Sequence, residues 1–127
     1  MNANEQIVRN FWSFFDEAAF DKAAELMEST AIVRWCNTRE IFKSRDNFIL
    51  ANKKYPGRWR IMVEKVLALE EMVISVARVE AEDHSFSLYV TSFFAFRDGR
   101  IAEIEEYWGD NGEPPEWRMK EKLAERY

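Results

Sequence analysis

The first half of the chain carries apolar residues at helical spacing. Between Asn4 and Ala19 they recur every three or four residues, which is the pattern of an amphipathic helix. A second, shorter helix is expected over residues 21–27, with Asp21 as its cap. Ser44 has the character of an N-cap for a third helix, and Tyr55-Pro56-Gly57 ends it. The pattern therefore predicts three helices in the N-terminal part of the chain.

From Arg58 onwards the apolar positions alternate with polar ones, as they do in strands. Residues 58–69 and 72–82 predict one antiparallel pair, and Phe86–Asp110 predicts a second. An earlier extended segment, residues 31–42, lies between the second and third helices. Helices that come early and long antiparallel strands that come late indicate an α+β fold, in which a curved sheet wraps around the helices.

The last strand pair is organised around Asp98-Gly99, a strong signal for a tight hairpin turn. A two-residue turn sets Phe96 opposite Ile101. Counting from this pair places one set of side chains on a common face: Tyr89, Thr91, Phe93, Ile104, Glu106 and Trp108. The opposite face then holds Val90, Phe94, Ile101 and Tyr107. A β-bulge would exchange the faces of one of the two strands.

Composition narrows the class of protein. The chain has 127 residues, of which 47% are hydrophobic, and it has a net charge of −5. We expect one domain over residues 1–127, and the acidic balance argues against nucleic acid or an anionic membrane as the main partner. Cys36 is the only cysteine, so an intrachain disulfide is excluded. We see no signal peptide and no membrane-spanning stretch, and we expect a cytoplasmic protein.

The order of the predicted elements resembles the nuclear transport factor 2-like superfamily, which includes ketosteroid isomerases and SnoaL-like polyketide cyclases. The local marks of the resemblance are residues 96–101 (FRDGRI) and 106–110 (EYWGD). Residues 35–42 (WCNTREIF) and Tyr55-Pro56-Gly57 look like a bacterial SnoaL-like subgroup of no established activity. The resemblance covers nearly the whole chain. It implies a cystatin-like cone, in which three N-terminal helices pack into a curved, mostly antiparallel sheet that encloses a pocket, commonly in a homodimer.

The resemblance also bears on catalysis. Where catalysis occurs in the superfamily, it uses a buried acid or an Asp/His pair. Relatives that act as epoxide hydrolases carry a carboxylate on the last strand, which Glu106 would match. Ser75 stands where their second acid is expected, and this departure argues against epoxide hydrolysis.

Glu106 is the best candidate for an acid, because its neighbours on the assigned face are mostly apolar. A carboxyl group desolvated there has a raised pKa and transfers protons near neutral pH. The alternative is a solvated Glu106 or one paired with Lys or Arg. Tyr89 and Asp110 are candidates for assisting groups, although Asp110 would also suit the Gly109–Gly112 turn.

Rings at several positions are candidates to line a pocket for a small, largely apolar ligand. The predicted pocket residues are Trp12, Trp35, Asn37, Phe42, Tyr55, Trp59, Thr91, Phe93 and Trp108. The same spacing also describes an ordinary filled core. Four cations surround Tyr55 and Trp59, either to hold an acidic group of a ligand at the rim or to bridge to a partner chain: Lys53, Lys54, Arg58 and Arg60.

Other chemistries have little support. His84 is the only histidine, so a histidine pair or a histidine-rich metal site is excluded, and we expect no metal or cofactor. Three functions remain open: an isomerase- or cyclase-like proton transfer at Glu106, ligand binding without chemistry, and an interaction module. The last would use the outer face of the sheet, with an apolar surface made by Val90, Phe94, Ile101 and Tyr107, for dimerisation.

Overall fold

The computed structural model describes residues 2–127. Its elements, in chain order, are α1 (Ala3–Asp16), α2 (Phe20–Ala24), β1 (Met27–Trp35), β2 (Glu40–Phe42), α3 (Arg45–Lys53), β3 (Trp59–Ala68), β4 (Met72–Ala81), β5 (Ser87–Arg97), β6 (Arg100–Asp110) and α4 (Glu116–Glu121). The α+β class is confirmed. The described chain has four helices, of which α1 and α3 are the two long ones, whereas we expected three helices at the N-terminal end. The second predicted helix ends early, because Met27 is fully buried as the first residue of β1.

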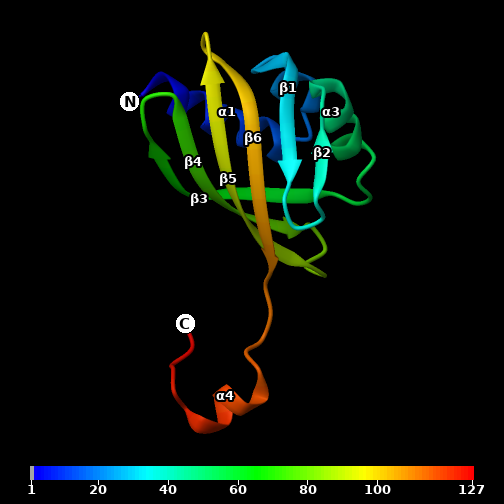
Figure 1. Ribbon diagram of the computed structural model, residues 1–127. Helices are drawn as coiled ribbons and strands as arrows, with labels where there is room; N and C mark the ends of the chain where they lie inside the picture. The colour runs from blue at the N-terminus through cyan, green and yellow to red at the C-terminus, as the bar shows by residue number, and fades with distance from the viewer. Residues whose placement is uncertain (1) are drawn as a thin grey trace.

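The six strands form one curved, open sheet in the order β2-β1-β6-β5-β4-β3 (Figure 1). Neighbouring strands are antiparallel except for β1 and β6, which are parallel. Helix α1 packs against β3 and β4, and α3 packs against β1. The concave face of the sheet is therefore the face that the helices cover, and the core lies between the two layers.

Local signals in the sequence account for the two long helices. The side chain of Asn2 accepts hydrogen bonds from the backbone N–H groups of the first turn of α1, and Ser44 does the same for α3 through Asn47. The buried face of α1 is made by Val8, Phe11, Trp12 and Phe15. The predicted cap at Ser44 is confirmed.

The β5–β6 hairpin contains a bulge that changes which side chains face the core. Asp98 and Gly99 both have positive φ, as a type I′ turn requires, and Phe96 pairs with Ile101 as predicted. The next pair is Ala95 with Glu103, so Ala102 is an extra residue in β6. From that point the faces of β5 are exchanged relative to our assignment.

The exchange corrects several predictions. Val90, Phe94 and Ile101 point into the core and are buried, so they do not form an outer apolar surface. Tyr89, Thr91 and Phe93 point to the outer face, on the same side as Tyr107 and away from Glu106. The physical reason is that the side chains of a strand alternate between its two faces. One inserted residue in β6 therefore exchanges the face of β5 that lies on the same side as Glu106.

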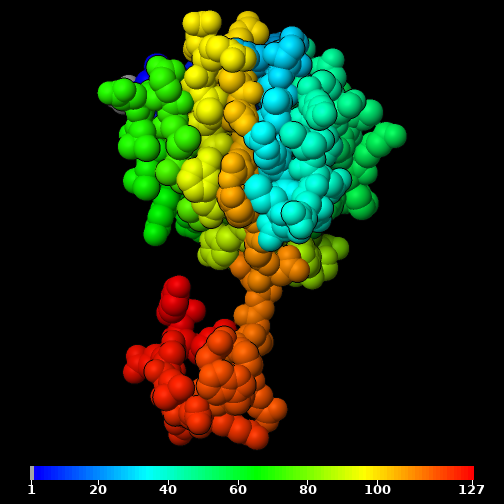
Figure 2. All heavy atoms as spheres, in the orientation of Figure 1, coloured from blue at the N-terminus to red at the C-terminus, as the bar shows by residue number. Residues whose placement is uncertain are grey.

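The chain leaves the body after β6. Figures 1 and 2 show residues 111–127 as an extended arm that ends in the short helix α4, below the narrow end of the sheet. Its large apolar side chains are exposed, namely Trp117, Met119, Leu123 and Tyr127. None of the helices described in residues 2–127 is long and apolar enough to span a membrane.

Candidate functional site

A cavity of about 740 Å³ opens between the concave face of the sheet and the helices. This volume falls in the range of sites that hold small organic molecules. Its wall is made mostly of aromatic and aliphatic side chains from α1, α2, β1 and the four long strands, among them Trp12, Phe15, Phe20, Trp35, Trp59, Ile61, Val79, Phe86, Leu88, Val90 and Trp108. The few polar groups on the wall therefore stand out.

Glu106 is one of those polar groups and is buried, with 5% of its surface exposed. It belongs to a polar row across the sheet, in which Trp35 of β1, Glu106 of β6, Ser92 of β5 and Ser75 of β4 are register partners. The Ser92 hydroxyl lies 2.6 Å from Glu106 Oε2, and Trp35 Nε1 donates to Oε1 at 3.1 Å. Trp12 Nε1 donates to Ser75 Oγ at 3.0 Å, which closes the far end of the row.

The surroundings of Glu106 favour its neutral form. Burial raises the pKa of its carboxyl group, and the hydrogen bonds from Ser92 and Trp35 oppose that shift. Among residues 2–127 no Lys or Arg forms an ion pair with Glu106, so the alternative of a carboxylate paired with Lys or Arg is wrong. A carboxyl group whose pKa is raised in this way keeps its proton to a higher pH than an exposed glutamate, which suits it to proton transfer.

Most of the predicted site residues meet at this cavity. Six predicted pocket residues line it, namely Trp12, Trp35, Asn37, Tyr55, Trp59 and Trp108, together with Glu106 and Asp110. Four of the predicted residues do not line it. Tyr89, Thr91 and Phe93 lie on the outer face because of the bulge, and Phe42 packs behind Trp35, with ring centroids 4.6 Å apart, against Phe48 of α3.

Asn37 has a positioning role in the wall of the cavity. Its Nδ2 donates to the carbonyl of Trp108 at 2.8 Å, and the backbone N–H of Trp108 donates to its Oδ1 at 2.8 Å. The ring of Trp108 lies against Trp35, with centroids 5.0 Å apart. Asn37 therefore holds the end of β6 beside β1, with both indoles in the wall.

Our sequence analysis missed the inward-facing row of β5, Leu88, Val90 and Ser92. Ser92 and Ser75 are both fully buried. A serine among apolar strand residues was the available signal, but only the pairing of β4, β5 and β6 brings both serines into line with Glu106.

Within residues 2–127 no group of three or more metal-ligating side chains is brought together. His84 is exposed in the β4–β5 connection, where its Nδ1 lies 2.6 Å from Glu80 Oε1. Cys36 is half-buried and carries a free thiol.

Comparisons with known proteins follow the fold rather than the sequence. No family model matches the chain, and no curated protein matches its sequence. Among solved structures, a candidate ketosteroid isomerase from Kribbella flavida is similar to it with a TM-score of 0.85 and 22% identity, over 98% of this chain and 90% of that one. The chain has the nuclear transport factor 2-like fold.

Two further structures support the same fold. An NTF-2 like protein of unknown function from Burkholderia xenovorans has a TM-score of 0.80 and 19% identity, over 96% of this chain and 93% of that one. An LEH-like epoxide hydrolase from M. tuberculosis has a TM-score of 0.72 and 13% identity, over 84% of this chain and 83% of that one. A polyketide cyclase candidate from Sinorhizobium meliloti and a SnoaL-like polyketide cyclase candidate from Shewanella putrefaciens are also among the similar structures. At these identities the likeness extends to the fold alone.

Proposed function

We propose that this protein binds a small, largely apolar molecule in the aromatic cavity and that Glu106 transfers a proton to or from it, in an isomerase- or cyclase-like reaction. The observation that carries the proposal is the buried Glu106, which lines the cavity, is held by two hydrogen-bond donors and has no cationic partner. Ketosteroid isomerase and SnoaL-like cyclase candidates share the fold, which is consistent with this chemistry.

Proton transfer at carbon needs a base near an acidic C–H group and a route for the same proton to return. A carboxyl group with a raised pKa suits both steps, because its ionised form is a stronger base than an exposed glutamate and its protonated form can return the same proton. Ser92 and Trp35 each engage one oxygen of Glu106 and fix its plane. Asp110 lines the same cavity and remains the candidate assisting group, whereas the outward-facing Tyr89 does not have this role.

A titration of the side-chain carboxyl groups by carbon-13 NMR tests the acid. We expect one Glu resonance to titrate well above the ordinary value of 4.5, because burial penalises the charged form. The resonance should be absent from Glu106→Gln and present in the control Glu105→Gln, which changes the neighbouring position on the opposite face. A Glu106 resonance that titrates at or below 4.5 would refute the catalytic role and leave a binding protein.

The outer face of the sheet favours a second role, the assembly of a homodimer. Large apolar side chains are exposed on this face, including Met62, Met72, Tyr89 (43% exposed) and Tyr107 (45% exposed). Several large apolar side chains exposed on one face are typical of a protein interface. We infer that two copies pack through this face.

A cytoplasmic location also stays a prediction, and imaging of the tagged chain in cells tests it.

Sedimentation equilibrium at micromolar concentrations tests the dimer. Wild type should sediment as a dimer and Tyr89→Glu combined with Tyr107→Glu as a monomer, because two charges would have to be buried at the interface. Tyr55→Glu is the control, since Tyr55 is equally exposed but lines the cavity. A monomeric wild type would contradict the proposal.

A further inference from the structure

The polar groups of the cavity wall other than Glu106 include three charged side chains, Lys53, Arg58 and Asp110. The Nζ of Lys53 lies 2.6 Å from Asp21 Oδ1, so a neighbouring carboxylate already neutralises this cation. Arg58 differs, because no carboxylate in residues 2–127 forms an ion pair with its guanidinium. It is the cation of the wall that lacks a counter-ion.

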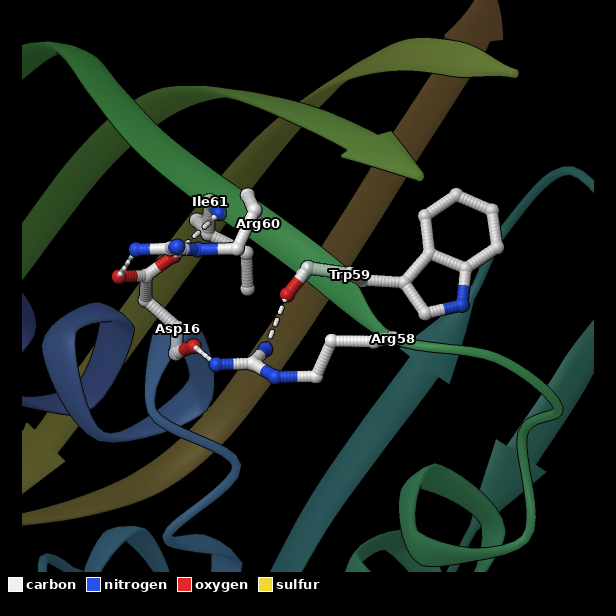
Figure 3. Close-up of polar contacts among 5 residues, drawn as sticks. All are labelled: Asp16, Arg58, Trp59, Arg60 and Ile61. Carbon is white, nitrogen blue, oxygen red and sulfur yellow. Dashed lines mark hydrogen bonds and ion pairs between the residues drawn. The ribbon is translucent and has the colours of Figure 1, made fainter. Parts of the chain in front are cut away.

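Figure 3 shows why the nearest carboxylate does not neutralise Arg58. Both oxygens of Asp16 are taken by Arg60, at 2.9 and 3.0 Å, and Oδ1 also accepts the backbone N–H of Ile61 at 2.8 Å. These bonds lower the pKa of Asp16, and the nearby charge of Arg58 also lowers it, but Arg60 occupies both carboxylate oxygens, so Asp16 forms no ion pair with Arg58. The backbone N–H of Glu82 donates to the carbonyl of Arg58, and the Glu82 carboxylate raises the pKa of Arg60, but neither Glu82 nor Asp16 forms an ion pair with Arg58 within residues 2–127.

Arg58 is nevertheless held in place. Its Nη1 donates to the carbonyl of Trp59 and its Nη2 to the carbonyl of Asp16 (Figure 3). Carbonyl oxygens orient a guanidinium without cancelling its charge, and two such bonds leave most of its N–H donors free. An oriented guanidinium with free donors in an apolar cavity is suited to pair with a carboxylate or sulfonate group.

Arg58 and Glu106 lie at different positions along the strands of the sheet. Glu106 lies in the row of Ser75, whereas Trp59, the neighbour of Arg58, pairs with Ala81 of β4. Residues 75 and 81 are six positions apart, which corresponds to about 20 Å along a strand. Glu106 and the unpaired guanidinium of Arg58 are therefore separated along the sheet by aromatic and aliphatic side chains of the cavity wall.

We propose that the ligand of this cavity is a small apolar organic acid, whose anionic group binds the guanidinium of Arg58 while its apolar body extends towards Glu106. This inference rests on the proposed function, since it needs the cavity to hold a ligand. It narrows the substrate class from apolar molecules in general to those with one anionic end. The carboxylate of Asp110, which lines the wall at the end of β6, disfavours a second negative charge on the ligand.

A matched pair of fluorescent probes tests the inference on the full chain. 8-Anilinonaphthalene-1-sulfonate and N-phenyl-1-naphthylamine share one ring system, and only the first carries a sulfonate group. We expect wild type to bind the sulfonate probe about tenfold more tightly than the neutral one, the size of effect expected of a charge-assisted pair. In Arg58→Gln the affinity for the sulfonate probe should fall about tenfold, and the affinity for the neutral probe should stay within about twofold.

Lys53→Gln is the matched control, because it removes one cation from the same wall whose charge Asp21 already neutralises. We expect it to change the affinity for the sulfonate probe by less than about twofold. If circular dichroism shows that Arg58→Gln does not fold, Arg58→Lys replaces it. That variant keeps the charge but loses the planar fork, and it should weaken the sulfonate probe selectively by about threefold or more.

The outcomes separate this inference from the proposed function. Equal affinity of wild type for both probes, or equal losses of the sulfonate probe in the Arg58 variant and Lys53→Gln, would overturn the role of Arg58 and leave the apolar cavity in place. Failure of wild type to bind either probe would overturn the proposed function itself.

Discussion

Phe94→Ala should lower the free energy of unfolding by about 3–5 kcal/mol, whereas Phe93→Ala should cost only about 1 kcal/mol. The side chain of Phe94 is fully buried, and its ring packs edge-on against Phe11 and Trp12, with centroids 5.4 and 6.1 Å away. Phe93 lies on the outer face beside Tyr107. Removal of the Phe94 ring leaves a cavity in the core, while removal of the Phe93 ring leaves a space on the outer face that water can occupy.

Urea unfolding of both variants, followed by circular dichroism, measures the two costs. The pair is well matched, since the same ring is removed from adjacent positions of one strand. The slope of unfolding against urea should stay at the wild-type value in both, which shows that each change acts on stability alone. A larger cost at Phe93 would show that β5 presents its other face to the core, and equal costs would contradict the prediction.

The second large effect is expected at Glu106, where Glu106→Gln should stabilise the protein increasingly as the pH rises above 4.5 and leave its stability unchanged below that pH. Burial raises the pKa of Glu106 in the folded chain above its ordinary value of 4.5. Between these two pKa values the folded chain keeps a proton that the unfolded chain releases, so a rise in pH favours unfolding. Each unit of pKa difference corresponds to about 1.4 kcal/mol of stability lost by wild type.

The Gln side chain reproduces the neutral acid without the titration. Its carbonyl oxygen can accept the N–H of Trp35, and its amide can donate to Ser92 Oγ, so the hydrogen bonds of the row are kept. Thermal unfolding of wild type and variant over a series of pH values measures the difference. Ser92→Ala removes a hydrogen bond that lowers the pKa of Glu106. The stability of this variant should therefore continue to fall with rising pH over a wider pH range than that of wild type. A difference that does not change with pH would mean that Glu106 has the same pKa in the folded and unfolded chains, which would contradict the raised pKa.

Local signals in the sequence determined the elements and several of their ends. Asp98-Gly99 specified a two-residue turn, because both positions adopt positive φ, and Ser44 specified the start of α3 through its side-chain oxygen. Apolar periodicity indicated the α+β class, and most of the predicted pocket aromatics reach one cavity. The turn, the cap and the periodicity depend on residues close together in the chain, which is why the sequence alone sufficed for them.

Only the tertiary structure decided which face of β5 is buried and which groups meet Glu106. Residues Tyr89–Phe94 carry apolar or aromatic side chains on both faces, so alternation cannot distinguish the faces, and the extra residue at Ala102 sets them through the pairing of β5 with β6. The row that joins Ser75, Ser92 and Glu106 comes from three strands. Arg58 forms no ion pair with Asp16 because Arg60 occupies the carboxylate of Asp16, which lies on a helix far away in the sequence. Such long-range pairing depends on sheet curvature and packing across the whole domain, which no local pattern encodes.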